Sequence, residues 1–318
     1  TMSNRLRLFD LSDERGVLRT SIATTLFIAL LGIGFGLFSG SASIIFDGAY
    51  STIDVFMSLL SLLAVNLIVA DRSSNGLSRK WKDRFSMGFW HLEPIILGVN
   101  GVLLIGAALY ALVTAVTSLL DGGRQLQFGW AIVYASVTFV VCVVIATLAW
   151  RANRRIGSDF VALDVKAWIM SAGITAALLL AFVLGYVLQG TQWAWITPYI
   201  DPAVLALVCL VIIPIPVATV RNALAEILLM TPLDLKEEVD ELAADFVARH
   251  GFLGHRAYVA RVGRSKVVEL YFIVPADAPA QPIGYWDALR EEIGHAIGDK
   301  GPDRWLSILF TADPGWTE

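Results

Sequence analysis

The sequence has few charged residues. Only 16% of its 318 residues are Asp, Glu, Lys or Arg, whereas 56% are hydrophobic. Soluble domains usually carry about 25% charged and about 45–50% apolar residues. Because so few charged side chains cannot cover a soluble fold, the composition predicts a membrane protein embedded in a lipid bilayer. The formal net charge of −4 adds little, since the charged residues are concentrated in a few segments.

Cysteine is also scarce, and several chemical motifs are absent. Cys142 and Cys209 both lie in apolar runs, which argues against a disulfide framework and against a thiolate metal site. The sequence contains no glycine-rich phosphate loop, no His-Glu-x-x-His motif and no basic, aromatic-rich patch for nucleic acid. We therefore expect no prosthetic group and no nucleic-acid partner.

Long apolar runs are what the sequence has in abundance. Six of them reach the length of about 20 residues that a helix needs to cross a bilayer. They lie at 20–38, 42–70, 92–119, 128–150, 160–187 and 200–229. Pro214 and Pro216 remove backbone donors from the last run, so we expect a kink there. The sequence thus predicts a six-helix transmembrane domain over residues 20–230, preceded by a short segment, residues 1–19.

The basic residues between these runs are unequally distributed. Twelve of them lie in the N-terminal segment and in the second and fourth connections: Arg5, Arg7, Arg15, Arg19, Arg72, Arg79, Lys80, Lys82, Arg84, Arg151, Arg154 and Arg155. The connections on the opposite side contain only Arg124. Because basic connections remain in the cytoplasm, both termini are predicted to be cytoplasmic, in a multi-pass protein of the cell inner (plasma) membrane.

Residues 231–318 have the composition of a soluble domain. Asp234 is expected to cap a first helix, and alternating apolar residues around Gly263 predict a β-hairpin. The two strands of the hairpin are expected at 255–262 and 266–274. A second helix is expected at 283–297 and a last strand at 305–310. The order α-β-β-α-β predicts a cytoplasmic α+β domain of the ferredoxin-like type, acting as a dimerisation or regulatory module.

Three aspartates lie inside the apolar runs. Asp47, Ser51 and Asp54 are spaced i, i+4, i+7 on the second run, which places them on one face of a helix. Asp164 lies on the fifth run. A carboxylate at bilayer depth costs about 2.5–3.5 kcal/mol on insertion scales, so such an acid marks a functional site by default. Acids that face one way predict an oxygen-lined cation site.

Four short segments occur in a characteristic order: Ser39-Gly40-Ser41-Ala42-Ser43, Asp47-Gly48-Ala49-Tyr50-Ser51-Thr52-Ile53-Asp54, Gly88-Phe89-Trp90-His91-Leu92-Glu93-Pro94 and Asp201-Pro202. In their order and spacing they resemble the cation diffusion facilitators, which are proton-coupled exporters of divalent metal. The resemblance extends from about residue 18 to residue 313. It implies a transporter rather than an enzyme, and a homodimer formed through the cytoplasmic domain.

The resemblance also implies a transport site built from one residue pair on the second span and one on the fifth. The pairs fall on Tyr50 with Asp54 and on Asp164 with Trp168, so an indole occupies one ligand position. Since the second span runs inward and the fifth outward, Asp47 and Trp168 both lie on the outer side of the remaining acids. Asp47 could supply the missing carboxylate. Alternatively, it lies near the outer interface, hydrogen-bonded to Ser51 or to water.

The neighbours of the expected site also allow alternatives. Tyr50 is either a metal ligand or a packing residue, and Ser51 and Trp168 are expected beside the ligands. Lys166 either extends to the cytoplasmic interface or neutralises an acid of the empty site. Asn100 either adds an oxygen to the site or forms a hydrogen bond between helices.

Additional metal positions of the family are depleted in this sequence. Phe89 and Phe310 stand where the family usually carries histidine. His91 and Asp313 are the remaining candidates for accessory metal ligands.

These observations predict a homodimeric secondary transporter that exports Mn²⁺, Fe²⁺ or Zn²⁺ from the cytoplasm in exchange for protons, with the metal as substrate. The alternative is a transport-poor paralogue that acts as a metal sensor or as the partner subunit of an active exporter. An intramembrane enzyme would need a nucleophile and a base at depth, and the acids in the spans are already assigned to the cation site.

Overall fold

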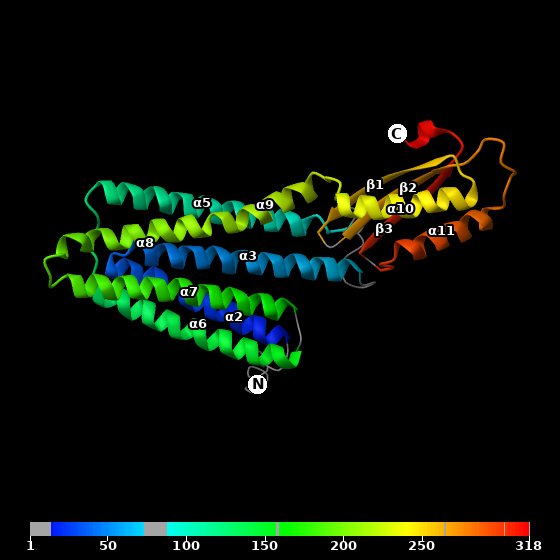
Figure 1. Cartoon of the computed structure of the whole chain (residues 1–318). Coiled ribbons are helices and arrows are strands. Elements are labelled where there is room, and N and C mark those ends of the chain that lie inside the picture. Colours follow the sequence, from blue (N-terminus) through cyan, green and yellow to red (C-terminus); the bar gives the residue numbers. More distant parts are fainter. Residues whose placement is uncertain (1–13, 73–87, 157–158, 264, 302, 318) are drawn as a thin grey trace. The chain divides into compact units, whose positions relative to one another are not determined.

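The computed structural model describes residues 14–72, 88–156, 159–263, 265–301 and 303–317 (Figure 1). The basic residues expected at positions 5 and 7 and between 79 and 84 lie outside these ranges. The chain forms two compact units: Thr1–Leu60 with Val99–Ala218, and Ser61–Gly98 with Thr219–Glu318. Each unit is described by itself below.

The six predicted spans are confirmed as helices. Within the described residues, six helical segments are long and apolar enough to cross a membrane. They are α2 (Glu14–Ser39), α3 (Ala42–Arg72), α5 (Leu92–Leu120), α6 (Phe128–Ile156), α7 (Asp159–Leu188), and α8 (Thr197–Ile212) followed by α9 (Pro214–Ile227). Helix α2 begins before residue 20, so residues 14–19 of the expected N-terminal segment are already helical.

The sixth span is interrupted where the prolines predicted a kink. Helix α8 follows a short 3₁₀ turn, η2 (Ala194–Ile196), and ends at Ile212. Pro214 opens α9 and Pro216 follows within its first turn. Amides of a first helical turn have no intrahelical partner, so proline is tolerated there at little cost. The two prolines therefore begin a new helix rather than bend a continuous one.

Helices α2 and α3 approach closely at two glycines. A Cβ atom added at Gly48 would lie 2.7 Å from the backbone nitrogen of Ile33, and one added at Gly32 would lie 2.9 Å from the Cα of Gly48. Only glycine leaves room for backbones this close. Asp47, next to Gly48, is thereby held beside α2.

A buried cluster consolidates the helices of the first unit. Tyr134 of α6 and Phe182 of α7 are almost fully buried, and Ile44 of α3 packs in the same cluster. Many large apolar side chains on these helices are instead exposed, among them Leu30 at 64% and Leu180 at 71%. Outward-facing apolar side chains are what a lipid-facing helix presents.

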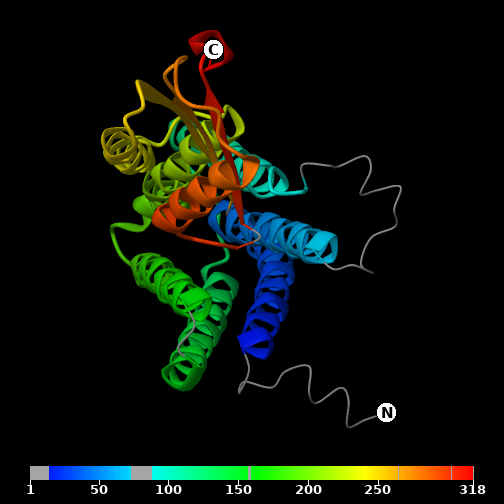
Figure 2. The same cartoon turned by 90° about the vertical axis from the view of Figure 1, so that its right-hand side faces the viewer.

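The C-terminal part of the second unit is a three-stranded sheet with two helices (Figure 2). Its strands are β1 (Gly254–Val262), β2 (Ser265–Ile273) and β3 (Arg304–Thr311), in the order β1-β2-β3. The β1–β2 pair is antiparallel and β2–β3 is parallel. Helices α10 (Leu233–His250) and α11 (Ile283–Ile297) complete the order α-β-β-α-β, which confirms the predicted α+β fold. A short 3₁₀ turn, η3 (Pro314–Thr317), follows β3.

The core of this domain lies between the sheet and its helices. Val268, Leu270 and Phe272 alternate along β2 and are at most 1% exposed. They pack against Phe246 of α10 and Ile293 of α11, so both helices cover the same sheet face. The opposite face carries partly exposed aromatic and aliphatic residues, Tyr258, Trp305 and Leu309.

The expectation for Asp234 was wrong. Pro232 occupies the N-cap of α10, and within the described residues no side-chain hydrogen bond caps this helix end. Asp234 lies inside the first turn, where its charge favours the positive end of the helix dipole. Its Oδ2 accepts a hydrogen bond from Nη2 of Arg261 at 3.2 Å.

The compact units do not divide at residues 230 and 231, where the composition changes. They divide within α3, α5 and α9. Two contacts within the second unit show why: the amide of Gly263 donates to Oε2 of Glu226 at 2.8 Å, and the rings of Trp90 and Trp305 lie 6.4 Å apart. The end of α9 and the residues before α5 therefore pack with the sheet domain.

Candidate functional site

The first unit contains a cavity of about 420 Å³ among its apolar helices. The residues that line it come from α2, α3, α5, α7, α8 and the beginning of α9: Ser21, Thr25, Ile28, Ser43, Phe46, Asp47, Tyr50, Ser51, Asp54, Leu104, Asp164, Ala167, Trp168, Met170, Ser171, Ile174, Leu178, Leu205, Val208, Ile212 and Ile215. All three aspartates that the sequence placed inside the spans lie on its wall. The cavity is therefore the candidate functional site.

One face of α3 supplies four of the polar wall residues. Asp47, Tyr50, Ser51 and Asp54 all line the cavity, as the helical spacing of the α3 acids predicts. Asp54 is exposed along this wall, whereas Asp47, Tyr50 and Ser51 are half-buried. The Tyr50 ring packs on Phe46 with ring centres 5.7 Å apart.

Asp47 has a partner that the sequence did not indicate. Its Oδ2 accepts a hydrogen bond from the hydroxyl of Tyr134 at 2.6 Å. Tyr134 lies on α6 and is only 2% exposed, so the partner is firmly held. The carboxylate of Asp47 is thus anchored to α6 by one oxygen, rather than to Ser51 as one of our alternatives proposed.

Asp164 is held by a chain of two hydrogen bonds. The Ser21 hydroxyl donates to Oδ1 of Asp164 at 2.7 Å, and Nε1 of Trp168 donates to Oγ of Ser21 at 2.7 Å. Oδ2 of Asp164 is buried and has no hydrogen-bond partner within the described structure. A buried acceptor without a partner costs about 1–3 kcal/mol, which a bound cation or proton would offset.

The remaining expected neighbours lie away from this cavity wall. Lys166 is exposed and does not line the cavity, although Asp164 and Ala167 on either side of it do. Asn100 lies one helical turn before the wall residue Leu104, and its buried Oδ1 has no hydrogen-bond partner in the described part of the chain. Neither residue contributes to the cavity in this conformation.

The accessory candidates belong to the second unit and are both exposed. His91 immediately precedes α5, and Asp313 closes the turn after β3, where its Oδ1 accepts the amide of Gly315 at 2.9 Å. Among the residues that the structure describes, no three His, Cys, Asp or Glu side chains converge closely enough to hold a metal ion. This holds for the three cavity aspartates as well, which share a wall but do not form a coordination shell.

Sequence reasoning missed Ser21 and Tyr134. Each hydroxyl lies within an apolar run, and a polar residue at depth is the available signal. Serine and tyrosine are common in transmembrane helices, however, and their partners lie 143 and 87 residues away in the chain. Such pairings depend on how the helices pack, which local patterns do not encode.

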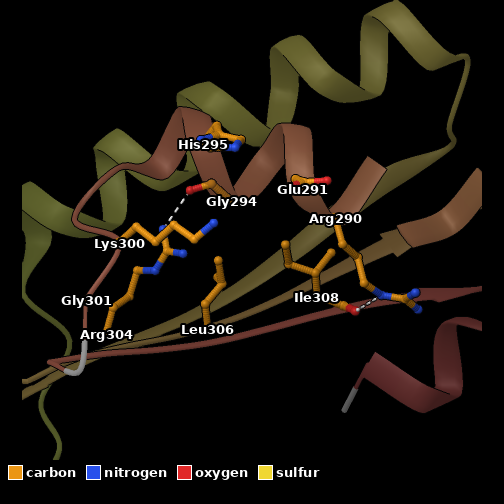
Figure 3. Close-up of a pocket in the computed structure, with 9 residues that line it drawn as sticks. All are labelled: Arg290, Glu291, Gly294, His295, Lys300, Gly301, Arg304, Leu306 and Ile308. Carbon is orange, nitrogen blue, oxygen red and sulfur yellow. Dashed lines mark hydrogen bonds between the residues drawn. The ribbon is translucent and has the colours of Figure 1, made fainter. Parts of the chain in front are cut away.

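A second pocket, of about 300 Å³, lies in the sheet domain between α11 and β3 (Figure 3). Figure 3 shows Arg290 and Arg304 directed at backbone carbonyls: Nε of Arg290 donates to Ile308 O at 3.1 Å, and Nη1 of Arg304 donates to Gly294 O at 2.6 Å. Both guanidinium groups thus link α11 and β3 to each other. The pocket is basic, but its arginines serve the packing of the domain.

Comparison with known proteins gives one family match and one similar protein. The model of the cation efflux transmembrane domain matches residues 18–228. The mouse (Mus musculus) protein solute carrier family 2, facilitated glucose transporter member 10 is 28% identical over 168 residues, which is 53% of this chain. The match spans only 28% of the length of that curated relative, so it does not place this chain in its family.

Proposed function

Since the chain belongs to the cation efflux family, the cation diffusion facilitators, whose transmembrane-domain model covers residues 18–228, we propose that it exports divalent metal from the cytoplasm in exchange for protons. The family match supports the coarser function, transport of metal cations out of the cytoplasm. The exchange with protons and the identity of the metal are our proposals.

One observation carries this proposal. Asp47, Asp54 and Asp164 line a single cavity within apolar helices, and Asp164 has one buried oxygen without a partner. Carboxylates are ligands for divalent cations and are also proton acceptors. A wall of this kind suits the binding of either species, but not both at once.

The exchange follows from competition for these carboxylates. A low-dielectric environment favours the neutral, protonated form of a carboxyl group, and a nearby cation favours the ionised form. Metal arriving from the cytoplasm would displace protons from the cavity. Protons arriving from the opposite side would displace the metal. Rocking of one helix group against another around a fixed site would alternate the access.

The chemistry of the wall bears on the choice of metal. Asp47, Tyr50, Asp54 and Asp164 offer oxygen atoms, and no histidine or cysteine is among the described residues that line the cavity. Oxygen ligands suit harder ions such as Mn²⁺, while imidazole and thiolate favour Zn²⁺ and Cu²⁺. We propose Mn²⁺, Fe²⁺ or Zn²⁺ as substrates, with the first two favoured more than they are in a histidine-bearing relative.

For the oligomeric state and the membrane location, we propose what the sequence predicts. We propose a homodimer that associates through the sheet domain, whose outer face exposes Tyr258, Trp305 and Leu309. We also propose an inner-membrane location with cytoplasmic termini, because the basic residues lie on that side.

The test is metal flux in proteoliposomes with an imposed pH gradient. Vesicles with an acidic lumen should accumulate Mn²⁺ or Zn²⁺ from the external medium, and vesicles without a pH gradient should not. Asp54→Asn and Asp164→Asn should lower the flux at least about tenfold. Asp121→Asn, an exposed aspartate at the end of α5, is the matched control and should retain wild-type flux. Normal flux in either cavity variant would overturn the site assignment.

A metal sensor or partner subunit is the second candidate. Two points favour it: no three ligating groups converge within the described structure, and the resemblance to the family places Trp168 where a ligand is expected. A sensor would bind metal without moving it. Saturable metal binding with no gradient-dependent flux in the same preparation would establish this alternative.

A further inference from the structure

Ser21, Trp168 and Asp164 form a hydrogen-bonded chain whose direction is fixed by chemistry. An indole nitrogen can only donate, a hydroxyl has one hydrogen, and an ionised carboxylate can only accept. Trp168 therefore donates to Oγ of Ser21, and the single Ser21 hydrogen goes to Oδ1 of Asp164, at 2.7 Å in each step. The Trp168 bond fills an acceptor position of Ser21 and leaves its hydrogen for the aspartate.

The two donors are held rigidly. Ser21 and Trp168 are each 6% exposed. Trp168 packs in a buried cluster with Ile28 of α2 and with Cys142 and Ala146 of α6. An indole packed in this way cannot rotate away without opening a cavity, and its N–H would then lose its acceptor. The chain thus persists as long as α2, α6 and α7 remain packed.

The two oxygens of Asp164 are unequal as a result. Oδ1 already accepts the Ser21 hydrogen, whereas Oδ2 is buried without a partner. A cation that approaches Asp164 therefore finds one free oxygen. To bind through both oxygens it would have to share Oδ1 with the hydrogen bond from Ser21, which weakens that oxygen as a ligand.

We propose that Ser21 and Trp168 are positioning residues that restrict Asp164 to binding the exported cation through one oxygen, and so favour small cations over large ones. This rests on the proposed function of the cavity. Small ions need few ligands and bind a carboxylate readily through one oxygen. Large ions take more oxygen ligands and often use both oxygens of a carboxylate. Trp168, which stands where the resemblance to the family places a ligand, would then act on the metal through Ser21.

Zn²⁺ and Cd²⁺ are the appropriate probes, because both are divalent ions with a filled d shell but differ in size. The affinity of the full-length protein for each ion is measured by titration in detergent, for wild type, Ser21→Ala and Trp168→Phe. Each variant should lower the preference for Zn²⁺ over Cd²⁺ by about tenfold, because the loss of affinity that follows removal of a group that orients a metal ligand should fall on Zn²⁺. Trp168→Phe retains the ring and removes only the donor.

Matched controls come from the same helices or the same residue type. Thr24→Ala removes an α2 hydroxyl that donates to Thr20 O of its own helix, and Trp150→Phe alters an exposed tryptophan of α6. Both should keep the wild-type preference. In the double variant Ser21→Ala with Trp168→Phe, the loss of preference should be smaller than the sum of the two single losses, because Trp168 donates to Ser21.

The outcomes are separable. Equal losses of Zn²⁺ and Cd²⁺ affinity in both variants would mean a purely structural role and would overturn the proposal, as would an unchanged preference or additive effects in the double variant. Metal binding without flux in wild type would reject the transport function, while the binding preference would still decide this proposal. A wild type that binds neither ion would overturn both.

Discussion

Asp201 on α8 holds the beginning of α3 through Ser41. The Ser41 hydroxyl donates to Oδ1 of Asp201 at 2.6 Å, and the amide of Ala42 donates to Oδ2 at 2.9 Å. Asp201 is 1% exposed and Ser41 is fully buried. A residue 160 positions away in the chain thus satisfies free donors at the start of α3, the helix that carries Asp47 and Asp54 of the cavity wall.

Removing this carboxylate should destabilise the protein. Asp201→Ala leaves the Ser41 hydroxyl and the Ala42 amide buried without acceptors, which should cost about 1–3 kcal/mol. Thermal unfolding in detergent measures the loss. Asp121→Ala, at an exposed aspartate, should leave the unfolding temperature unchanged. Equal unfolding temperatures for Asp201→Ala and wild type would show that α3 does not need this anchor.

Asp47 and Tyr134 can be tested as a pair. If Asp47 supplies a carboxylate to the metal, Asp47→Asn should weaken metal binding about as much as Asp54→Asn does. Tyr134→Phe should have a smaller effect, because it frees Oδ2 of Asp47 but keeps the charge. Tyr110→Phe, at a tyrosine that is 77% exposed, is the control. Unchanged metal affinity in Asp47→Asn would assign Asp47 to helix packing alone.

The ligand type at position 50 should govern metal preference. Tyr50→His introduces an imidazole on the cavity wall, and imidazole favours Zn²⁺ relative to Mn²⁺. Competition binding should show the preference shifting toward Zn²⁺ by about tenfold. The matched change Tyr110→His is on an exposed face and should have no effect. A wild-type protein that already excludes Mn²⁺ and Fe²⁺ would contradict the oxygen-lined site.

The sheet domain should show a small, defined dependence on pH. A hydrogen bond from Lys266, together with its charge, holds the pKa of Asp299 below its usual range. A lowered folded-state pKa gives stability that is present above the ordinary aspartate pKa and is lost as the pH falls through the folded value. The effect should be small, because Asp299 is exposed.

Asp299→Asn should therefore reduce the fall in unfolding temperature as the pH is lowered. Asparagine tolerates the left-handed backbone found here, with φ of +50°, so the change removes charge without new strain. Unfolding temperature is followed from neutral to acid pH, with the exposed Asp277→Asn as reference. If the unfolding temperatures of Asp299→Asn and wild type fall equally at acid pH, Asp299 makes no such contribution.

The helices and strands were predictable because their signals are local. The apolar runs fixed the six spans to within several residues, and alternation predicted β1 and β2 with their turn near Gly263. The i, i+4, i+7 spacing correctly placed Asp47, Ser51 and Asp54 on one wall. These features depend on periodicity within a single element.

The partners of the acids were not predictable, because they come from other helices. Nothing local links Ser21 to Asp164 or Tyr134 to Asp47, and Trp168 gave no sign that its ring nitrogen would point at a serine of α2. The error at Asp234 has a related cause. A carboxylate near the start of a helix predicts an N-cap. In the structure, however, Pro232 is the N-cap of α10 and Asp234 pairs with Arg261.

The contact between Gly32 and Gly48 has a mechanical consequence. Where flexible side chains separate two helices, the helices can slide by changing rotamers, but here backbone atoms meet directly and such adjustment is unavailable. An axial shift of α3 against α2 would drive main-chain atoms together within a fraction of a turn. We therefore expect α2 and α3 to move as one rigid body at this contact. A displacement of α2 would then move Asp47, which lies next to Gly48, by a similar amount.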